Sequence, residues 1–251
     1  MALTNPTRRA FFQRLAVSGC VLLPTADQDQ IQYHGRADRI EVSRRKQKIQ
    51  VVASEHPSGF AIDRFSHRLF VANEIDEYQD LPAGSVESYA IDPATGQIEL
   101  RDRRRLSLSA TGPKHLAISP DGRHLVVAAY SGGAYNVLPV QANGKIGEVK
   151  QVLKEIGSGP HPEKQATAHP HSVAFHPSGK LVVATDLGAD RISLFSFESG
   201  RLRRIQQIKT PPGSGPADLR VSNQYVSVEY ELQPFRRRYQ FSSINGTPCL
   251  V

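Results

Sequence analysis

The stretch that decides the fold reads HPHSVAFHPSGKLVVA and occupies residues 169–184. A short apolar run leads into a Pro-Ser-Gly-Lys turn, and a second apolar run follows the turn. Two short apolar runs around such a turn predict a β-hairpin. Residues 56–72 and 112–129 repeat this order, and residues 215–221 repeat its first half.

The hairpins recur at a regular spacing. The intervals between Pro57, Pro113, Pro170 and Pro216 are 56, 57 and 46 residues. A further strand pair follows most hairpins, and four strands in about 40–50 residues is the period of a propeller blade. We therefore predict an all-β protein, a β-propeller of four-stranded antiparallel blades. A two-sheet sandwich with coincidental similarity is the alternative, but the repeated order of proline, strand, turn and strand disfavours it.

Composition is that of an ordinary globular domain. The 251 residues are 39% hydrophobic and 22% charged, and 17 prolines and 19 glycines interrupt the apolar runs. No run approaches the ~18 apolar residues of a membrane-spanning helix. Cys20 and Cys249 are the only cysteines, which excludes a disulfide scaffold and a cysteine-rich zinc site.

The chain carries an excess of positive charge, with 31 Lys and Arg against 24 Asp and Glu. Basic clusters fall at residues 8–9, 44–46, 103–105 and 236–238. A nucleic-acid reader gathers its charge on one face and adds stacking aromatics, whereas these clusters lie between strand-like runs. We expect solvated turns and no nucleic-acid partner, although the excess could help to attract an anionic small substrate.

The N-terminus resembles an export signal. Residues 7–13 read TRRAFFQ, similar to a twin-arginine motif, and an apolar stretch follows at residues 15–23. We expect residues 1–26 to be a signal segment, residues 27–251 to be the folded domain and the protein to be exported to the periplasm. The alternative is an amphipathic N-terminal helix on a cytoplasmic protein. The VSGC at residues 17–20 also resembles a lipoprotein box, but too little apolar chain precedes it.

The repeat also predicts where a site lies. The start of each first strand and the end of its partner share one end of the blade, because antiparallel strands return. One set of residues follows the repeat prolines, namely Ser58, Lys114, His171 and Ala217. The other set follows the second apolar runs, namely Glu74, Tyr130, Asp186 and Glu231. A convergent polar set at a channel mouth predicts a binding or catalytic site, although single members could instead satisfy buried backbone groups.

Several motifs together resemble one family. They are Ala-Asn-Glu at residues 72–74, Ser-Gly-Gly at 131–133, HPHSVAFHP at 169–177 and DLGADR at 186–191. These are similar to the lactonase family of seven-bladed propellers, which includes propeller-type 6-phosphogluconolactonase and carboxy-muconate lactonising enzyme. The resemblance runs from about residue 40 to about residue 232. It implies a site at the channel mouth without metal or cofactor, with the family histidine at His171 and the family glutamate at Glu231.

The chain departs from the family pattern in two ways. Ala217 stands where the family has an arginine, and Asp218 stands where it has a histidine. Residues 28–251 are 224 residues, enough for about four to five blades, so we expect a truncated propeller. The blade pattern weakens after Glu231, and we expect residues 235–251 to form an irregular tail.

The resemblance implies hydrolysis of a sugar lactone, 6-phosphogluconolactonase-like and part of carbohydrate metabolism. His171 would be the base that activates water, and Glu231 would orient it or share that role. The candidate substrate-binding residues are Lys114, His115, Glu74, Asp186 and Arg191. Because a cation aimed at the developing oxyanion is missing at Ala217, we expect weakened or absent turnover.

Other readings of the same residues stay open. The chain could be a carboxy-muconate cyclase-like isomerase, or a propeller that binds a ligand without turnover. Four histidines, His161, His169, His171 and His176, lie close together in the sequence, but their spacing matches no standard zinc pattern, so we expect no metal. The identity of the lactone or carboxylate and the oligomeric state are not predicted.

Overall fold

The computed structural model describes residues 20–23 and 31–251, and within them the regular structure consists of β-strands. The strands form five four-stranded sheets, each antiparallel and in chain order. The first sheet, blade 1, contains β1 (Cys20–Leu23), β2 (Ile31–Arg36), β3 (Arg39–Arg44) and β4 (Gln47–Ala53). Blade 2 contains β5 (Pro57–Asp63), β6 (Arg68–Asn73), β7 (Ser85–Ile91) and β8 (Ile98–Arg105).

The other three blades repeat this plan. Blade 3 contains β9 (Pro113–Ile118), β10 (His124–Ala129), β11 (Ala134–Pro139) and β12 (Gln151–Lys154). Blade 4 contains β13 (Pro170–Phe175), β14 (Leu181–Asp186), β15 (Arg191–Glu198) and β16 (Arg201–Lys209). Blade 5 contains β17 (Pro216–Val221), β18 (Tyr225–Tyr230), β19 (Arg236–Ile244) and β20 (Thr247–Leu250). The predicted β-propeller of four-stranded antiparallel blades is confirmed.

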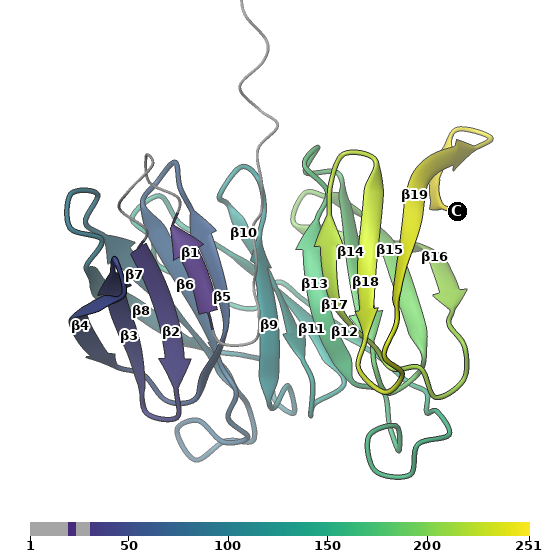
Figure 1. Cartoon of the computed structure of the whole chain (residues 1–251), viewed down its shortest axis with the longest axis horizontal. Helices are drawn as coiled ribbons and strands as arrows, with labels where there is room; N and C mark the ends of the chain where they lie inside the picture. Colours follow the sequence, from purple (N-terminus) through teal and green to yellow (C-terminus); the bar gives the residue numbers. More distant parts are fainter. Residues whose placement is uncertain (1–19, 24–30) are drawn as a thin grey trace, which may run out of the picture.

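The first strand of each blade is its inner strand. Successive inner strands contact one another, β1 with β5, β5 with β9, β9 with β13 and β13 with β17. Figure 1 shows the blades following one another in chain order, from purple at β1 to yellow at β19. Within the described residues, no helix has the length and apolarity needed to cross a membrane.

The expected signal segment is only partly described. Its twin-arginine motif lies outside the described residues, whereas Cys20–Leu23 form β1 and pair with β2, Leu23 opposite Ile31. Cleavage after residue 26 would therefore remove the inner strand of blade 1.

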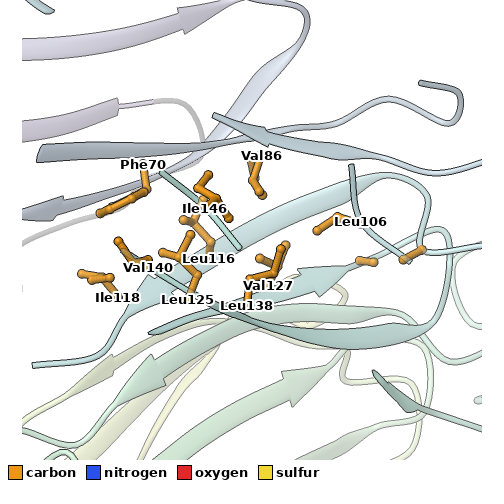
Figure 2. Packing of buried hydrophobic residues seen from close by; sticks show 13 residues of the cluster. Phe70, Val86, Leu106, Leu116, Ile118, Leu125, Val127, Leu138, Val140 and Ile146 are labelled. Carbon is orange, nitrogen blue, oxygen red and sulfur yellow. The ribbon is translucent and has the colours of Figure 1, made fainter. Parts of the chain in front are cut away.

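The hydrophobic core is divided among the interfaces between neighbouring blades. One cluster joins Phe70 and Val86 of blade 2 to Leu116, Leu125 and Val127 of blade 3 (Figure 2). Three other clusters join blades 1 and 2, blades 3 and 4, and blades 4 and 5. The apolar face of each sheet is therefore buried against the next sheet rather than in one central core.

Glutamine side chains join the outer strands of successive blades. The Gln151 amide of β12 donates to the Leu202 carbonyl at 2.9 Å and accepts from the Leu202 N–H at 2.7 Å. Gln50 of β4 makes the same pair of bonds with Ile98, and Gln206 of β16 makes them with Leu250. Each amide bonds both backbone groups of one residue, so it fixes the next blade without a strand-to-strand ladder. We call these contacts glutamine bridges.

Residues 235–251 differ from the expected irregular tail, because they form β19 and β20. Asn245 and Gly246 both have positive φ, +50° and +78°, as the tight turn of a hairpin requires. Tyr239 and Leu250 are buried, while Arg237 and Arg238 lie on the rings of Tyr239 and Tyr225. In the sequence, the three consecutive arginines argue against a strand, whereas the Asn245-Gly246 pair indicates the turn of a hairpin.

Replacing Gln151 with alanine is expected to lower the free energy of unfolding by about 1–3 kcal/mol, because it leaves both backbone groups of Leu202 without their partner. Gln207→Ala is the control, since Gln207 is an exposed glutamine of β16, and its effect should stay within about 0.5 kcal/mol. Chemical denaturation of the two variants measures both values. Equal decreases in the free energy of unfolding of the two variants would show that the glutamine bridge adds nothing to stability.

Candidate functional site

A β-bulge follows the proline that begins the inner strand in blades 2 to 5. The pairing register shifts between Pro57 and Gly59, at Lys114, between Pro170 and Ser172, and between Pro216 and Leu219. The residues left over by these shifts are Ser58, Lys114, His171, Ala217 and Asp218. A bulge re-aims a side chain out of the strand's alternation. The predicted set after the prolines is thus displayed by one repeated backbone feature.

His171 is the most enclosed of the bulged polar side chains, with 5% of its surface exposed. Its Nε2 lies 3.5 Å from Oε2 of Glu231, and its Nδ1 lies 3.7 Å from Oδ1 of Asp218. The Ser172 hydroxyl lies 3.4 Å from the same Nδ1. The structure therefore brings His171 and Glu231 together, as predicted, and it adds Asp218 on the other side of the ring.

Glu231 follows β18 and is shared between two cationic or potentially cationic groups. Its Oε1 accepts a hydrogen bond from the Lys164 ammonium at 2.6 Å, while Oε2 faces His171. The contact with His171, helped by Lys164, lowers the pKa of Glu231 to about 2 despite the opposing effect of burial. Glu231 is therefore a carboxylate at neutral pH, which suits it to orient the imidazole or to stabilise its protonated form.

Tyr130 and the groups around it form the neighbouring wall. The Tyr130 ring stacks on the His169 ring with centroids 4.4 Å apart, and the Lys114 ammonium lies 4.9 Å from the Tyr130 centroid. His169 also bonds the Tyr130 carbonyl through Nδ1 at 3.0 Å. Burial raises the pKa of Tyr130, and so do the nearby charges of Glu231 and Glu74. Lys114 and Glu74 therefore lie at the same mouth as His171, with Glu74 exposed.

His115 lies next to the bulge of blade 3. Burial, together with the neighbouring His171, lowers the pKa of His115 to about 4, so its imidazole is neutral at pH 7. Its Nδ1 accepts the Val173 N–H at 3.4 Å. The proton of the neutral ring then belongs on Nε2, which leaves His115 as a hydrogen-bond donor beside the inner strand of blade 4.

Asp186 and Arg191 are placed in an internal ion pair. Asp186 accepts the backbone N–H of His169 at 2.8 Å and the Arg191 guanidinium at 2.7 Å. Arg191 also donates to Glu155 at 2.8 Å and to the Ile156 carbonyl at 2.9 Å. The polar atoms of both side chains are thus committed to holding the chain around the site, as the alternative reading of such residues anticipated.

The strand register explains the position of Asp186. Asp186 pairs with Pro170 as Asn73 pairs with Pro57 in blade 2. The repeat position of Glu74, Tyr130 and Glu231 is therefore occupied in blade 4 by Leu187. A shift of one residue exchanges the two faces of a strand, so Asp186 points into the blade and not toward the mouth.

The four neighbouring histidines do not converge. His161 accepts the backbone N–H groups of Glu163 and Lys164, and His176 bonds the Asn223 carbonyl. His169 stacks on Tyr130, and His171 faces the two carboxylates. Among residues 20–23 and 31–251, no group of three or more His, Cys, Asp or Glu side chains is arranged to hold a metal ion.

Besides Asp218, sequence reasoning missed two contributors to this site. Lys164 comes from the long connection between β12 and β13, where no periodic pattern marks a position, and only its proximity to the HPH motif could have drawn attention to it. His169 was considered as a metal ligand, whereas its ring supports Tyr130.

The model of the family described as Lactonase, 7-bladed beta-propeller, matches residues 32–233. The chain is 27% identical to a 6-phosphogluconolactonase of Bacillus subtilis over 160 residues, 59% of this chain and 45% of that protein. It is 28% identical to a 6-phosphogluconolactonase of Formosa agariphila over 138 residues, 53% of this chain and 38% of that protein. The chain thus spans less than half the length of each of these relatives.

Similarity to solved structures extends to both fold and sequence. The periplasmic gluconolactonase of Pseudomonas aeruginosa superposes with a TM-score of 0.73 and 30% sequence identity, covering 86% of this chain and 64% of that one.

Proposed function

This chain belongs to the lactonase family of seven-bladed β-propellers, and from that premise we propose that it hydrolyses a small lactone at the bulged ends of blades 3 to 5. The observation that carries the proposal is the position of His171, which lies between the carboxylates of Glu231 and Asp218 at 3.5 and 3.7 Å. A buried imidazole oriented by a carboxylate is suited to general acid–base work.

The proposed reaction uses His171 in both directions. The imidazole accepts a proton from water as the water oxygen attacks the lactone carbonyl carbon. The tetrahedral intermediate then collapses, the ring C–O bond breaks, and the leaving oxygen takes the proton back from the imidazolium. The acid product releases its own proton to the solvent. Glu231 stays ionised throughout and stabilises the imidazolium formed between the two steps.

The negative charge that develops on the lactone carbonyl oxygen during the attack must be stabilised by a hydrogen-bond donor. Lys114 is the proposed donor, because its ammonium lies at the mouth above Tyr130 and no carboxylate oxygen of the described residues is its ion-pair partner. Ala217 is buried, and its methyl group supplies no charge where the family has an arginine. Removing one oxyanion donor costs about a hundredfold in rate, so we propose a slow enzyme.

The charges also favour a neutral substrate. Asp218 and Glu231 flank His171, and Glu74 lies near Tyr130. Lys164, the other lysine at the site, is already paired with Glu231. A phosphate dianion would meet these carboxylates, whereas the hydroxyl groups of an unphosphorylated sugar lactone can donate hydrogen bonds to them. We propose a neutral sugar lactone, as the name of the Pseudomonas relative also indicates for that protein.

A binding propeller without turnover is the second candidate. It is favoured by Ala217 and Asp218 together, because the first removes a cation and the second adds a carboxylate 3.7 Å from His171. Binding of gluconolactone without acid release would support this candidate.

We also propose export. The support is the TRRAFFQ motif at residues 7–13 and the similarity to a relative described as periplasmic.

The purified protein is expected to open δ-gluconolactone about a hundredfold more slowly than the Pseudomonas gluconolactonase assayed beside it. His171→Ala should reduce acid release to the spontaneous rate, because the base is lost. A pH-stat records both. Hydrolysis at the rate of the relative, or full activity of the alanine variant, would contradict the assignment.

The same assay tests the substrate charge. We expect kcat/KM for δ-gluconolactone to exceed that for 6-phosphogluconolactone by about tenfold or more, since a phosphate group would approach Asp218 and Glu231. Asp218→Asn should narrow the difference by improving the phosphorylated substrate. A preference for the phosphorylated lactone in the unaltered protein would refute the charge argument.

Export is tested by the paired arginines. Replacing Arg8 and Arg9 with lysine should retain an epitope-tagged chain in the cytoplasm, whereas Arg14→Lys, the matched control, should leave it in the periplasmic fraction. Cell fractionation and immunoblotting measure the distribution. If all three chains are distributed alike, the motif has no export role.

A further inference from the structure

The connection between β12 and β13, residues 155–169, is a built part of the site. We call it the 155–169 loop. Gln165 is fully buried in it, and its Nε2 donates to the Leu187 carbonyl at 2.8 Å while its Oε1 accepts the His161 N–H at 3.1 Å. A Cβ on Gly188 would lie 1.9 Å from the Thr167 carbonyl oxygen. The loop therefore rests directly on the backbone of blade 4.

Lys164 is held at a defined place on this loop. His161 Nδ1 accepts the backbone N–H of Lys164 at 3.2 Å and that of Glu163 at 3.3 Å. The next residue is the buried Gln165, whose backbone N–H donates to the His161 carbonyl at 3.0 Å. The backbone of Lys164 is thus fixed from both sides, and only its side chain extends toward blade 5.

The Lys164 side chain gives the two carboxylate oxygens of Glu231 different partners. The Lys164 ammonium takes Oε1 at 2.6 Å, which leaves Oε2 facing Nε2 of His171 at 3.5 Å. A carboxylate held by one oxygen cannot turn that oxygen to the imidazole, so the pair sets the direction in which Glu231 faces His171. Lys164 of the 155–169 loop, Glu231 of blade 5 and His171 of blade 4 thus form a chain of three groups in contact.

We propose that Lys164 is a positioning residue: it holds the Glu231 carboxylate in the orientation that aligns His171 for catalysis. The proposal rests on the proposed lactonase function and adds a residue outside the propeller repeat to its machinery.

A purely structural role does not account for the pair. The Lys164 and Glu231 side chains are 47% and 35% exposed, and ion pairs at such exposure add little to stability. The loop already has its own anchor in Gln165, which is independent of Lys164. The effect of Lys164 is therefore concentrated on the carboxylate that it touches, in agreement with the low pKa of Glu231.

The test compares Lys164→Met and Lys164→Arg, with Lys180→Met as the control. Lys180 is exposed on the β13–β14 hairpin at the far end of blade 4, so its loss changes the net charge equally. We expect Lys164→Met to lower kcat for δ-gluconolactone about tenfold or more with little change in KM, because misplacement of a catalytic group costs rate. Lys164→Arg should retain most of the kcat of the unaltered protein, and Lys180→Met should have the same kcat as the unaltered protein.

A second measurement does not depend on turnover. Carbon-13 NMR of the Glu231 carboxyl should show its pKa rising by about one unit in Lys164→Met and staying low in Lys164→Arg and Lys180→Met. If the unaltered protein opens no lactone but the titration shifts, the pairing stands and the proposed lactonase function fails.

Two results would overturn the positioning role. One is an unchanged kcat together with an unchanged Glu231 titration in Lys164→Met. The other is a loss of kcat in Lys164→Met that Lys164→Arg does not rescue, together with an unfolding temperature of Lys164→Met as low as that of Gln165→Ala. Gln165→Ala serves as the reference variant, because it disrupts the loop itself.

Discussion

The site depends on the bulge that follows each inner-strand proline. Proline has no N–H, so it can begin a strand without leaving a donor unpaired. The residue after it has no partner on the second strand and leaves the pleat. The same backbone geometry then carries serine in blade 2, lysine in blade 3, histidine in blade 4 and the Ala217-Asp218 pair in blade 5. The functional group at this position therefore differs between blades because the bulged residue changes, whereas the backbone of the bulge is the same.

The frame is held by contacts that join one blade to the next. Apolar clusters fill every interface between the described blades, and the glutamine bridges fix the outer strands. Near the site, Asp186, Arg191 and Glu155 form an internal ion-pair network across blades 3 and 4. That network bonds the His169 N–H, one residue before Pro170, and so fixes the entry to the bulge that carries His171. The buried ions thus act on the site through the backbone.

The sequence was sufficient for the repeated parts and insufficient for the local exceptions. The recurring proline, turn and apolar runs predicted the blades and placed His171, Glu231 and Lys114 at one mouth. Asp186 was assigned to that mouth because the alignment slipped by one residue, which only the strand register reveals. Three consecutive arginines in β19 argued against a strand, but the guanidinium groups of Arg237 and Arg238 lie over the rings of Tyr239 and Tyr225, a contact that the sequence does not show. Lys164 lies on a loop without periodicity, so its approach to Glu231 depends on the folded loop.

The most direct test of the account is a crystal structure of the chain with gluconate, the product of the proposed reaction. We predict that the gluconate carboxylate lies within hydrogen-bond distance of His171 and Lys114, with its hydroxyl groups toward Asp218 and Glu74. Gluconate bound elsewhere on the propeller, with this mouth filled only by water, would contradict the claim that the bulged residues of blades 3 to 5 form the functional site.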